Sequence, residues 1–342
     1  MIGVAIIGYG YWGPNLVRCF AETDGCRVVA VADQSPAALA SVAKRHPQAR
    51  LYADWREALA DPEVDAVVVA TPVSSHYEIS LAALRSGRHV LVEKPLTETA
   101  AQARHLVEEA ETRGLTLLVD HTFIYSPAVT KMKTLIGSGD LGQIYYYDST
   151  RINLGLFQRD VNVIWDLAVH DLAILHHVLE SPPTAISANG VSHVQGAPEN
   201  MAHLTVYLEN GAVAHLNVNW LAPVKVRQVL IGGSRKMIVW NDLEPSEKIR
   251  VYDKGVSVTG DLEEIYASRV SYRSGDMWAP RLATTEPLLT EAAHFIDCIQ
   301  TRATPITSGR LGLQVVEMLE AATRSMKMRG HPVELSPQRR AS

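Results

Sequence analysis

The first 120 residues alternate short apolar runs with stretches of helical periodicity. Apolar runs predict buried parallel strands over residues 4–7, 28–32, 66–70, 90–92 and 115–119. Amphipathic patterns predict helices between them, over residues 14–20, 36–45, 76–86 and 98–113. Because repeated strand–helix alternation is typical of a doubly wound parallel sheet, we expect residues 1–122 to form an α/β domain of that kind.

A different pattern follows residue 122. It predicts helices over residues 128–136, 163–179, 290–301 and 309–329, and strands over residues 145–151, 185–193, 202–209, 212–220, 228–232, 236–240 and 249–252. The turn Glu209-Asn210-Gly211 predicts a hairpin, and hence antiparallel neighbours. We therefore expect residues 123–342 to form an α+β domain with one open, mostly antiparallel sheet, which the helices at about 290–329 complete. A sheet covered on one face needs a partner for the other, which predicts a homodimer or homotetramer.

Composition and charge exclude several classes of partner. The chain has 342 residues, of which 47% are hydrophobic, and no apolar stretch is long enough to cross a bilayer. The 32 basic and 37 acidic residues are intermixed and give a net charge of −5, which argues against nucleic acid. No signal peptide is recognisable, and Cys19, Cys26 and Cys298 lack metal-ligand spacing. We expect a cytoplasmic protein that acts on a small molecule, without a metal or a membrane partner.

A glycine loop, Gly8-Tyr9-Gly10-Tyr11-Trp12-Gly13, follows the first apolar run and opens a helix. In a dinucleotide-binding Rossmann domain the first glycine permits the tight turn, the second admits the pyrophosphate, and the third lets the helix pack closely. The free N–H groups of the helix N-terminus then face the phosphates. The loop predicts the cofactor contacts Gly8, Gly10, Tyr11, Trp12 and Gly13.

Asp33 ends the second predicted strand, and no lysine or arginine follows it before Lys44. An acid at this position accepts hydrogen bonds from ribose hydroxyls and repels a 2′-phosphate, which favours NAD over NADP. Thr71 and Pro72 end a later strand at the same sheet edge, and His76 follows in a helix. These three are expected to line the dinucleotide crevice, although an ordinary helix entry would also explain His76.

Glu93-Lys94-Pro95 follows the strand at residues 90–92, at the edge where a nicotinamide ring would lie. Glu93 and Lys94 are therefore expected at the cofactor, with Glu93 orienting the lysine. Asp166 and His170 stand four residues apart on the predicted helix 163–179 and so share one stripe beside its buried face. A carboxylate and an imidazole placed this way can hold a hydroxyl and remove its proton. A solvated helix face would carry the same pair.

Taken together, these motifs resemble the Gfo/Idh/MocA family of sugar oxidoreductases over essentially the whole chain. The resemblance implies that Lys94 reaches the reacting hydroxyl or ketone, and that Asp166 and His170 bind and deprotonate it. Two departures from the family pattern stand in the same helix, Ala168 in place of a common glycine and Asp171 directly after the histidine. Either Lys94 or His170 can be the base.

Within that family, residues 11–15, 162–167 and 272–276 look like nucleotide-sugar dehydrogenases that oxidise the 3-hydroxyl of UDP-N-acetylglucosamine. The alternatives are a TDP-keto-sugar 3-ketoreductase, a dehydrogenase of a free sugar or inositol, and a non-catalytic regulator that senses NAD or a sugar. A regulator is disfavoured because Lys94 and His170 are both present. The remaining candidates for substrate contact are Tyr125, Arg151, Asn153, Asn162 and Arg273.

Overall fold

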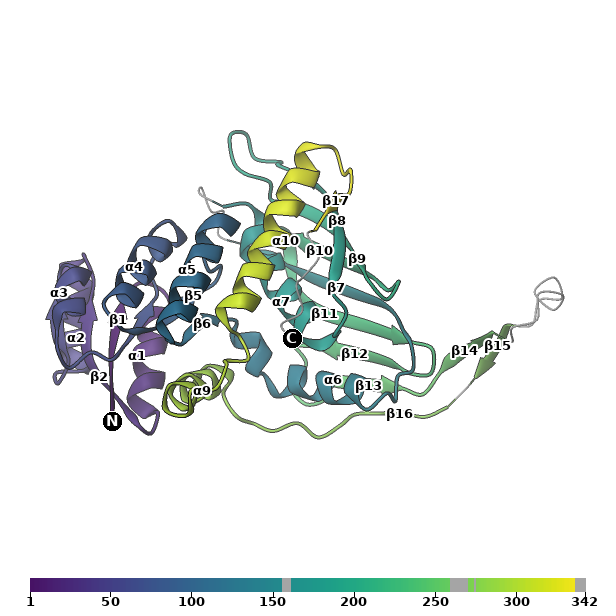
Figure 1. Ribbon diagram of the computed structural model, residues 1–342. Coiled ribbons are helices and arrows are strands. Elements are labelled where there is room, and N and C mark those ends of the chain that lie inside the picture. Colours follow the sequence, from purple (N-terminus) through teal and green to yellow (C-terminus); the bar gives the residue numbers. More distant parts are fainter. Residues whose placement is uncertain (156–160, 259–269, 274, 336–342) are drawn as a thin grey trace. The chain divides into compact units, whose positions relative to one another are not determined.

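The computed structural model of the chain describes residues 1–155, 161–258, 270–273 and 275–335. It divides into two compact units, and Figure 1 follows the chain through them by colour. The first unit comprises Met1–Ser126 and Thr285–Glu317, and the second comprises Pro127–Thr284 and Met318–Ser342. The expected boundary at residue 122 lies close to the first passage between the units, but the chain later returns to the first unit.

Within the described residues, a six-stranded parallel sheet with the order β3-β2-β1-β4-β5-β6 forms the centre of the first unit. Its strands are β1 (Ile2–Ile7), β2 (Cys26–Ala32), β3 (Arg50–Tyr52), β4 (Ala66–Val69), β5 (His89–Glu93) and β6 (Leu117–Asp120). This order confirms the doubly wound prediction. The sequence pattern did not predict β3, because this edge strand has three residues and none of them is fully buried.

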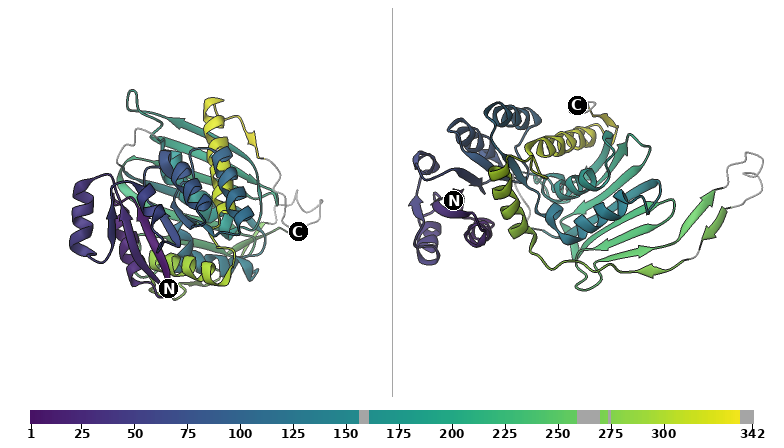
Figure 2. Two further views of the ribbon diagram at one scale, coloured as in Figure 1. Left: turned by 60° about the vertical axis from the view of Figure 1, so that its left-hand side comes forward. Right: turned by 60° about the horizontal axis from the view of Figure 1, so that its bottom comes forward.

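Helices lie on both faces of this sheet (Figure 2). They are α1 (Gly13–Glu22), α2 (Pro36–Arg45), α3 (Trp55–Ala60), α4 (Val73–Arg85) and α5 (Ala100–Arg113). Side-chain caps define several of their ends, as where the Thr99 hydroxyl accepts from the Gln102 N–H before α5 and Gly114 adopts a left-handed conformation after it. Helix α3 was not predicted, since six residues are too few to establish a periodicity.

Helix α9 (Pro287–Thr301) packs on α1 inside the first unit. Phe295 meets Phe20 edge to face, with ring centroids 6.2 Å apart, and Leu288 and Ile296 join the same apolar core. The expected division assigns this helix to the second domain, whereas the structure places it in the first. An amphipathic pattern predicts one apolar face but does not identify the surface that this face will cover.

The second unit contains a mixed sheet of nine strands among the described residues, in the order β16-β13-β12-β11-β7-β10-β9-β8-β17. Only the β7–β10 pair of the described ladder is parallel, which confirms a mostly antiparallel sheet. The predicted hairpin joins β9 to β10 through Gly211 at φ 83°. The strands are β7 (Ile144–Leu154), β8 (Pro183–Val191), β9 (Met201–Leu208), β10 (Val213–Asn219), β11 (Leu221–Gly233), β12 (Met237–Asn241), β13 (Ile249–Tyr252), β16 (Met277–Trp278) and β17 (Val333–Glu334), beside a separate pair, β14 (Gly255–Val258) and β15 (Val270–Arg273).

Helices α6 (Pro127–Gly137), α7 (Val169–Val178) and the end of α10 (Gly309–Lys327) cover one face of this sheet (Figure 2). The alternation along β10 matches this arrangement, because Ala214, Leu216 and Val218 are buried while His215 on the opposite face is exposed. Among the described elements, no helix covers that opposite face. The open sheet predicted from the sequence is therefore confirmed.

Candidate active site

The glycine loop makes a close turn between β1 and α1. Gly8 has φ 99°, and a Cβ atom there would lie 2.5 Å from the carbonyl oxygen of Ala70. A Cβ atom on Gly13 would lie 2.4 Å from the carbonyl oxygen of Gly8, so these two glycines are required by the loop itself. Gly10 differs, because a Cβ atom there would meet nothing within 4 Å. The space above Gly10 is open to a ligand, as the predicted pyrophosphate contact requires.

Asp33 closes the glycine loop from the end of β2. Its Oδ2 accepts from the Tyr9 N–H at 2.6 Å, and its Oδ1 accepts from the Ser35 N–H at 2.7 Å. A carboxylate offers about four acceptor positions, so Asp33 retains capacity for ribose hydroxyls. Together with Gly10, Thr71 and Pro72 it lines a cavity of about 360 Å³. The residues expected at the adenosine end of a dinucleotide therefore share one cavity and fit such a ligand.

His76 does not line that cavity. The ring is buried, with Nδ1 2.9 Å from the carbonyl oxygen of Pro95 and Nε2 2.8 Å from that of Thr71. Burial lowers the pKa of the ring, although the two carbonyl groups oppose this effect. His76 thus connects the loop after β4 to the loop after β5, and its contact with the cofactor stays a prediction.

The Glu93-Lys94-Pro95 segment begins where β5 ends. Ile7 pairs with both Ala32 and Val69, and Val69 pairs with Val92, so the loops after β1, β2, β4 and β5 leave the sheet at the same edge. Lys94 is half-buried, its N–H donates to Glu93 Oε2 at 3.1 Å, and the Lys94–Pro95 peptide bond is cis. The lysine therefore lies at the carboxyl edge of the first sheet, where the cofactor is expected.

Trp12 and Tyr125, which the sequence predicts as contacts of the cofactor and the substrate, each have a hydrogen-bond partner inside this unit. Trp12 donates from Nε1 to Asp120 Oδ2 at 3.2 Å, which ties the glycine loop to the end of β6, whereas Tyr11 is exposed. Tyr125 is buried in the short helix η1 (Thr122–Tyr125), and its hydroxyl lies 3.0 Å from Thr307 Oγ1. Burial raises the pKa of this phenol. The structure gives Tyr125 an internal partner and no exposed position from which to contact a substrate.

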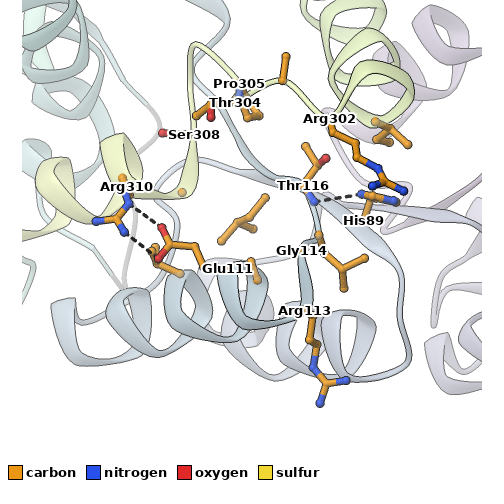
Figure 3. A pocket seen from close by; sticks show the side chains of 17 residues that line it. His89, Glu111, Arg113, Gly114, Thr116, Arg302, Thr304, Pro305, Ser308 and Arg310 are labelled. Carbon is orange, nitrogen blue, oxygen red and sulfur yellow. Dashed lines mark hydrogen bonds and ion pairs between the residues drawn. The ribbon is translucent and has the colours of Figure 1, made fainter. Parts of the chain in front are cut away.

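A larger cavity, of about 710 Å³, lies at the opposite edge of the first sheet (Figure 3). His89 and Thr116 border it at the beginnings of β5 and β6. Its Arg310 forms a two-point ion pair with Glu111, at 2.5 and 2.7 Å. Ligands of open α/β sheets bind at the carboxyl ends of the strands, so this cavity is not the expected cofactor site.

In the second unit, Asp166 and His170 occupy a helical segment that is not a continuous α-helix. A π-helical turn, η2 (Ile164–Ala168), holds Asp166, and α7 begins directly after it. The Trp220 indole N–H donates to Asp166 Oδ2 at 3.0 Å, which orients the carboxylate. Both Asp166 and His170 are half-buried. The helix predicted at about residues 163–179 is present, and it begins with a π-turn, which hydrophobic periodicity does not distinguish from an α-turn.

Asn162 starts this segment and does not face outward. Its Oδ1 accepts from the Ile164 and Trp165 N–H groups at 3.1 and 3.3 Å, and its amide donates to Glu199 at 3.2 Å. The side chain is buried and satisfies the free N–H groups at the helix start. Asn162 therefore caps the helix start, and its contact with substrate stays a prediction.

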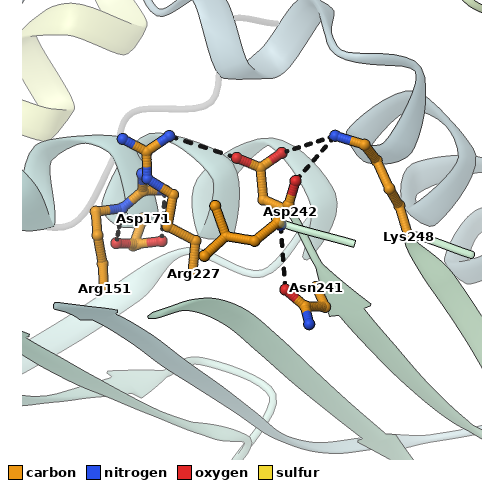
Figure 4. Close-up of polar contacts among 7 residues, drawn as sticks. Arg151, Asp171, Arg227, Asn241, Asp242 and Lys248 are labelled. Atoms are coloured by element: carbon orange, nitrogen blue, oxygen red, sulfur yellow. Dashed lines mark hydrogen bonds and ion pairs between the residues drawn. The ribbon is translucent and has the colours of Figure 1, made fainter. Parts of the chain in front are cut away.

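Arg151, on β7, makes a buried ion pair with Asp171 on α7 (Figure 4). The guanidinium donates to the two carboxylate oxygens at 2.7 and 3.1 Å, and both residues are at most 2% exposed. Burial opposes the charge on Arg151, but Asp171 outweighs it, so the pKa stays raised. Arg227, Asp242 and Lys248 extend the network on the same side of the sheet. Arg151 is thus engaged through Nε and Nη2 by the residue next to His170, and its contact with substrate stays a prediction.

The last two substrate candidates lie on other strands. Asn153 is half-buried near the end of β7. Arg273 ends β15, and its side chain lies outside the described part of the chain. Among the described residues, no group of three or more histidine, cysteine or acidic side chains could hold a metal ion, and no helix is long and apolar enough to cross a membrane.

Sequence reasoning missed the structural roles of two groups of residues. Trp220 and Asp171 act on the Asp166–His170 segment, and the carboxylates of Asp120 and Glu291 lie near Glu93. A signal for Asp120 does exist, because it ends β6 as Glu93 ends the neighbouring β5. Nothing in the linear pattern marks Glu291, which reaches the cluster from α9.

A glycine turn, an acid after β2 and a lysine after β5 at one edge of a parallel sheet define a dinucleotide-dependent oxidoreductase. The chain belongs to the Gfo/Idh/MocA oxidoreductase family. The family model of the NAD-binding Rossmann fold matches residues 2–121, and that of the C-terminal alpha/beta domain matches residues 133–335. The expected family, fold class and enzyme class are confirmed.

Its relatives have different named activities. Scyllo-inositol 2-dehydrogenase (NAD⁺) of Bacillus subtilis is 24% identical, covering 99% of this chain and 96% of the relative. UDP-N-acetylglucosamine 3-dehydrogenase of Acidithiobacillus ferrooxidans is 26% identical, covering 91% of this chain and 93% of the relative. A solved structure of the latter enzyme has a TM-score of 0.81 at 24% identity, covering 96% of this chain and 99% of that one. At this identity the structural likeness concerns the fold.

Proposed function

We propose that this protein is an NAD-dependent dehydrogenase that transfers a hydride between a secondary hydroxyl carbon of a sugar and nicotinamide. The observation that carries the proposal is the shared sheet edge, where the Gly8 turn, Asp33 and Lys94 end three parallel strands. When bound, the nicotinamide supplies the hydride acceptor. The first substrate to test is UDP-N-acetylglucosamine, at its 3-hydroxyl, because a relative that covers nearly the whole chain carries that name.

The choice of NAD over NADP rests on Asp33. Its hydrogen bonds from the Tyr9 and Ser35 N–H groups hold the carboxylate in the lining of the 360 Å³ cavity, where a 2′-phosphate would bring a second negative charge close to it. No basic residue lies between Asp33 and Lys44 to offset that repulsion. The same argument weighs against a TDP-keto-sugar reductase that uses NADPH.

Three side chains of the protein have separate roles in the proposed reaction. Lys94 holds the reacting oxygen and stabilises the charge that develops on it. Asp166 orients the hydroxyl, since the Trp220 N–H fixes the direction of its carboxylate. His170 takes the proton, because the ordinary pKa of an imidazole lies near neutral pH. Lys94 is the alternative base, and single-residue variants decide between the two.

We also propose that the open face of the second sheet forms a homodimer or homotetramer interface. Leu230 of β11 stands opposite Val239 of β12, and Ile152 of β7 stands opposite Val226 of β11, all of them half-buried. Half-buried apolar pairs on an uncovered face favour a second copy of the chain as the partner that covers them.

The cytoplasm is the proposed compartment, because Cys19, Cys26 and Cys298 are free thiols.

The test is to mix the purified protein with NAD and UDP-N-acetylglucosamine and to follow the near-ultraviolet absorbance of reduced nicotinamide. Parallel reactions contain NADP, free N-acetylglucosamine or scyllo-inositol. Lys94→Ala and His170→Ala are each expected to lower kcat by about 100-fold or more while NAD affinity changes little. Lys44→Ala and His177→Gln serve as controls. Wild-type kcat in both site variants contradicts the assigned site, and turnover of inositol alone moves the assignment to a free polyol.

A further inference from the structure

Three carboxyl groups from different elements meet inside the first unit. Glu93 and Asp120 end β5 and β6 and are paired in register, and Glu291 comes from α9. Asp120 and Glu291 are 2% and 0% exposed, and Oε1 of Glu93 is buried. Glu93 and Glu291 each interact with Asp120, so the aspartate stands between the two glutamates.

The three carboxyl groups differ in how many hydrogen bonds they accept. Asp120 accepts from Trp12 Nε1 and from the Thr122 N–H, both at 3.2 Å, and also from the Thr122 hydroxyl. Glu93 accepts at Oε2 from the Lys94 N–H. Within the described residues, Oε1 of Glu93 and both oxygens of Glu291 are buried and have no donor in good hydrogen-bond geometry, although the Thr122 hydroxyl lies near enough to Glu291 to favour its charged form. Buried acceptors without donors are rare in folded proteins, so these oxygens need an explanation.

A proton on each glutamate accounts for Oε1 of Glu93 and for one oxygen of Glu291, and the Thr122 hydroxyl is the donor near the other oxygen of Glu291. A protonated carboxyl group has an O–H that can donate, so each glutamic acid can donate to the neighbouring aspartate. Ionised glutamates would instead place three negative charges together away from water, which is very unfavourable. In agreement, burial raises the pKa of Glu291 and of Glu93 well above the usual range, and Asp120 raises both further.

We propose that Glu93, Asp120 and Glu291 form a proton-sharing cluster that holds two protons and one negative charge on Asp120, and that this cluster positions Lys94. The second half of this proposal rests on the proposed function. Lys94 follows Glu93 directly, and its positive charge acts on that carboxyl group. The three acids are positioning residues, because they act on the reaction through the lysine.

The other titratable groups around the cluster add little charge. His121 is buried beside Asp120, and burial lowers its pKa to about 4, so the ring is neutral at neutral pH. Tyr125 faces Glu291, and burial keeps its phenol protonated. His294 and Cys298 of α9 lie near Tyr125, with 5.6 Å between the ring centroids of His294 and Tyr125, and burial disfavours the charged form of each. The charge of the cluster is therefore balanced by Lys94.

Infrared spectroscopy of the whole protein in D₂O tests the protonation directly. Wild type at pD 8 is expected to show carbonyl bands of protonated carboxylic acids, and Glu291→Gln is expected to lose one of them. Glutamine is isosteric with a neutral glutamic acid and still donates, so this variant should fold. Glu78→Gln, at an exposed position, is the matched control and should change nothing. A wild-type spectrum without protonated acid, or an unchanged spectrum in Glu291→Gln, overturns the cluster.

The pH profile of NAD-dependent turnover tests the positioning role. Asp120→Asn removes the one negative charge of the cluster. The variant is expected to move the pH profile of turnover to lower pH by about one unit, because the ammonium group of Lys94 loses a nearby countercharge. Glu291→Gln keeps that charge and should retain the wild-type profile. Identical profiles in wild type and Asp120→Asn refute the role. Absence of turnover with every substrate refutes the proposed function and this role together, whereas the infrared result decides the cluster by itself.

Discussion

Replacing Asp171 with asparagine tests how strongly the buried ion pair holds helix α7 on the sheet. The substitution keeps the shape of the side chain but leaves the Arg151 guanidinium without its countercharge. Arg151 and Asp171 are 2% and 1% exposed and make two hydrogen bonds of 3.1 Å or less. Removing one partner of a pair buried this deeply costs about 3–5 kcal/mol, because the other charge stays buried.

The matched control is a surface pair with the same separation. Arg56 and Glu78 also stand 2.7 Å apart, but their side chains are 59% and 63% exposed. Glu78→Gln is expected to change the free energy of unfolding little, because solvent screens exposed pairs. The double variant Arg151→Met/Asp171→Leu removes both buried charges and should recover most of the loss, since apolar replacement of a whole buried pair is often neutral.

Urea unfolding followed by tryptophan fluorescence measures these differences, with Trp220 and Trp240 as buried reporters in the second unit. With a urea dependence of about 3 kcal/mol per molar, a loss of 3–5 kcal/mol lowers the midpoint by about 1–2 M. An Asp171→Asn midpoint equal to that of Glu78→Gln would refute the reasoning. So would a double variant no more stable than the single one, because the cost would then not arise from an unpaired charge.

Four further predictions concern the first unit. Asp33→Asn should raise kcat/KM for NADP relative to that for NAD by about tenfold, because it removes a repulsion of ~1.4 kcal/mol between the carboxylate and the 2′-phosphate. An unchanged ratio of the two kcat/KM values contradicts this. The pKa of Glu291 is raised in the folded state, so its proton contributes fully to the free energy of unfolding at pH values below the ordinary pKa of a glutamate. This contribution is lost as the pH rises, by about 1.4 kcal/mol per pH unit for one proton. Glu291→Gln should flatten that slope in urea unfolding between pH 5 and pH 8, and parallel curves would argue against a buried neutral acid. Gly13→Ala should reduce both thermal stability and NAD affinity, since its Cβ would lie 2.4 Å from a carbonyl oxygen. Gly10→Ala should keep its melting temperature yet lose NAD affinity in calorimetric titration, and normal binding there would refute the assigned loop role.

Several features could be predicted from the sequence because their causes are local. The helix over residues 36–45 was predicted with the bounds that the structure gives, since a serine cap and a proline define its start. The strand at residues 249–252 and the Asn210-Gly211 hairpin follow in the same way from alternation and turn chemistry. The glycine spacing and Asp33 likewise predict the cofactor edge, because strand ends in a parallel sheet share one side.

Only the tertiary structure decided which side chains meet. Arg151, Asn162 and Tyr125 are polar residues near the predicted site, but each has an internal partner, which pattern analysis cannot detect. The π-turn under Asp166 and the packing of α9 on the first unit depend on contacts distant in the sequence. Glu291 reaches Asp120 and Glu93 only through that packing. The sequence by itself therefore determined most of the elements, the family and the expected cofactor edge, because each depends on neighbouring residues. The carboxyl cluster and the buried ion pairs depend on the folded arrangement, because burial and partnership arise only when distant segments pack together.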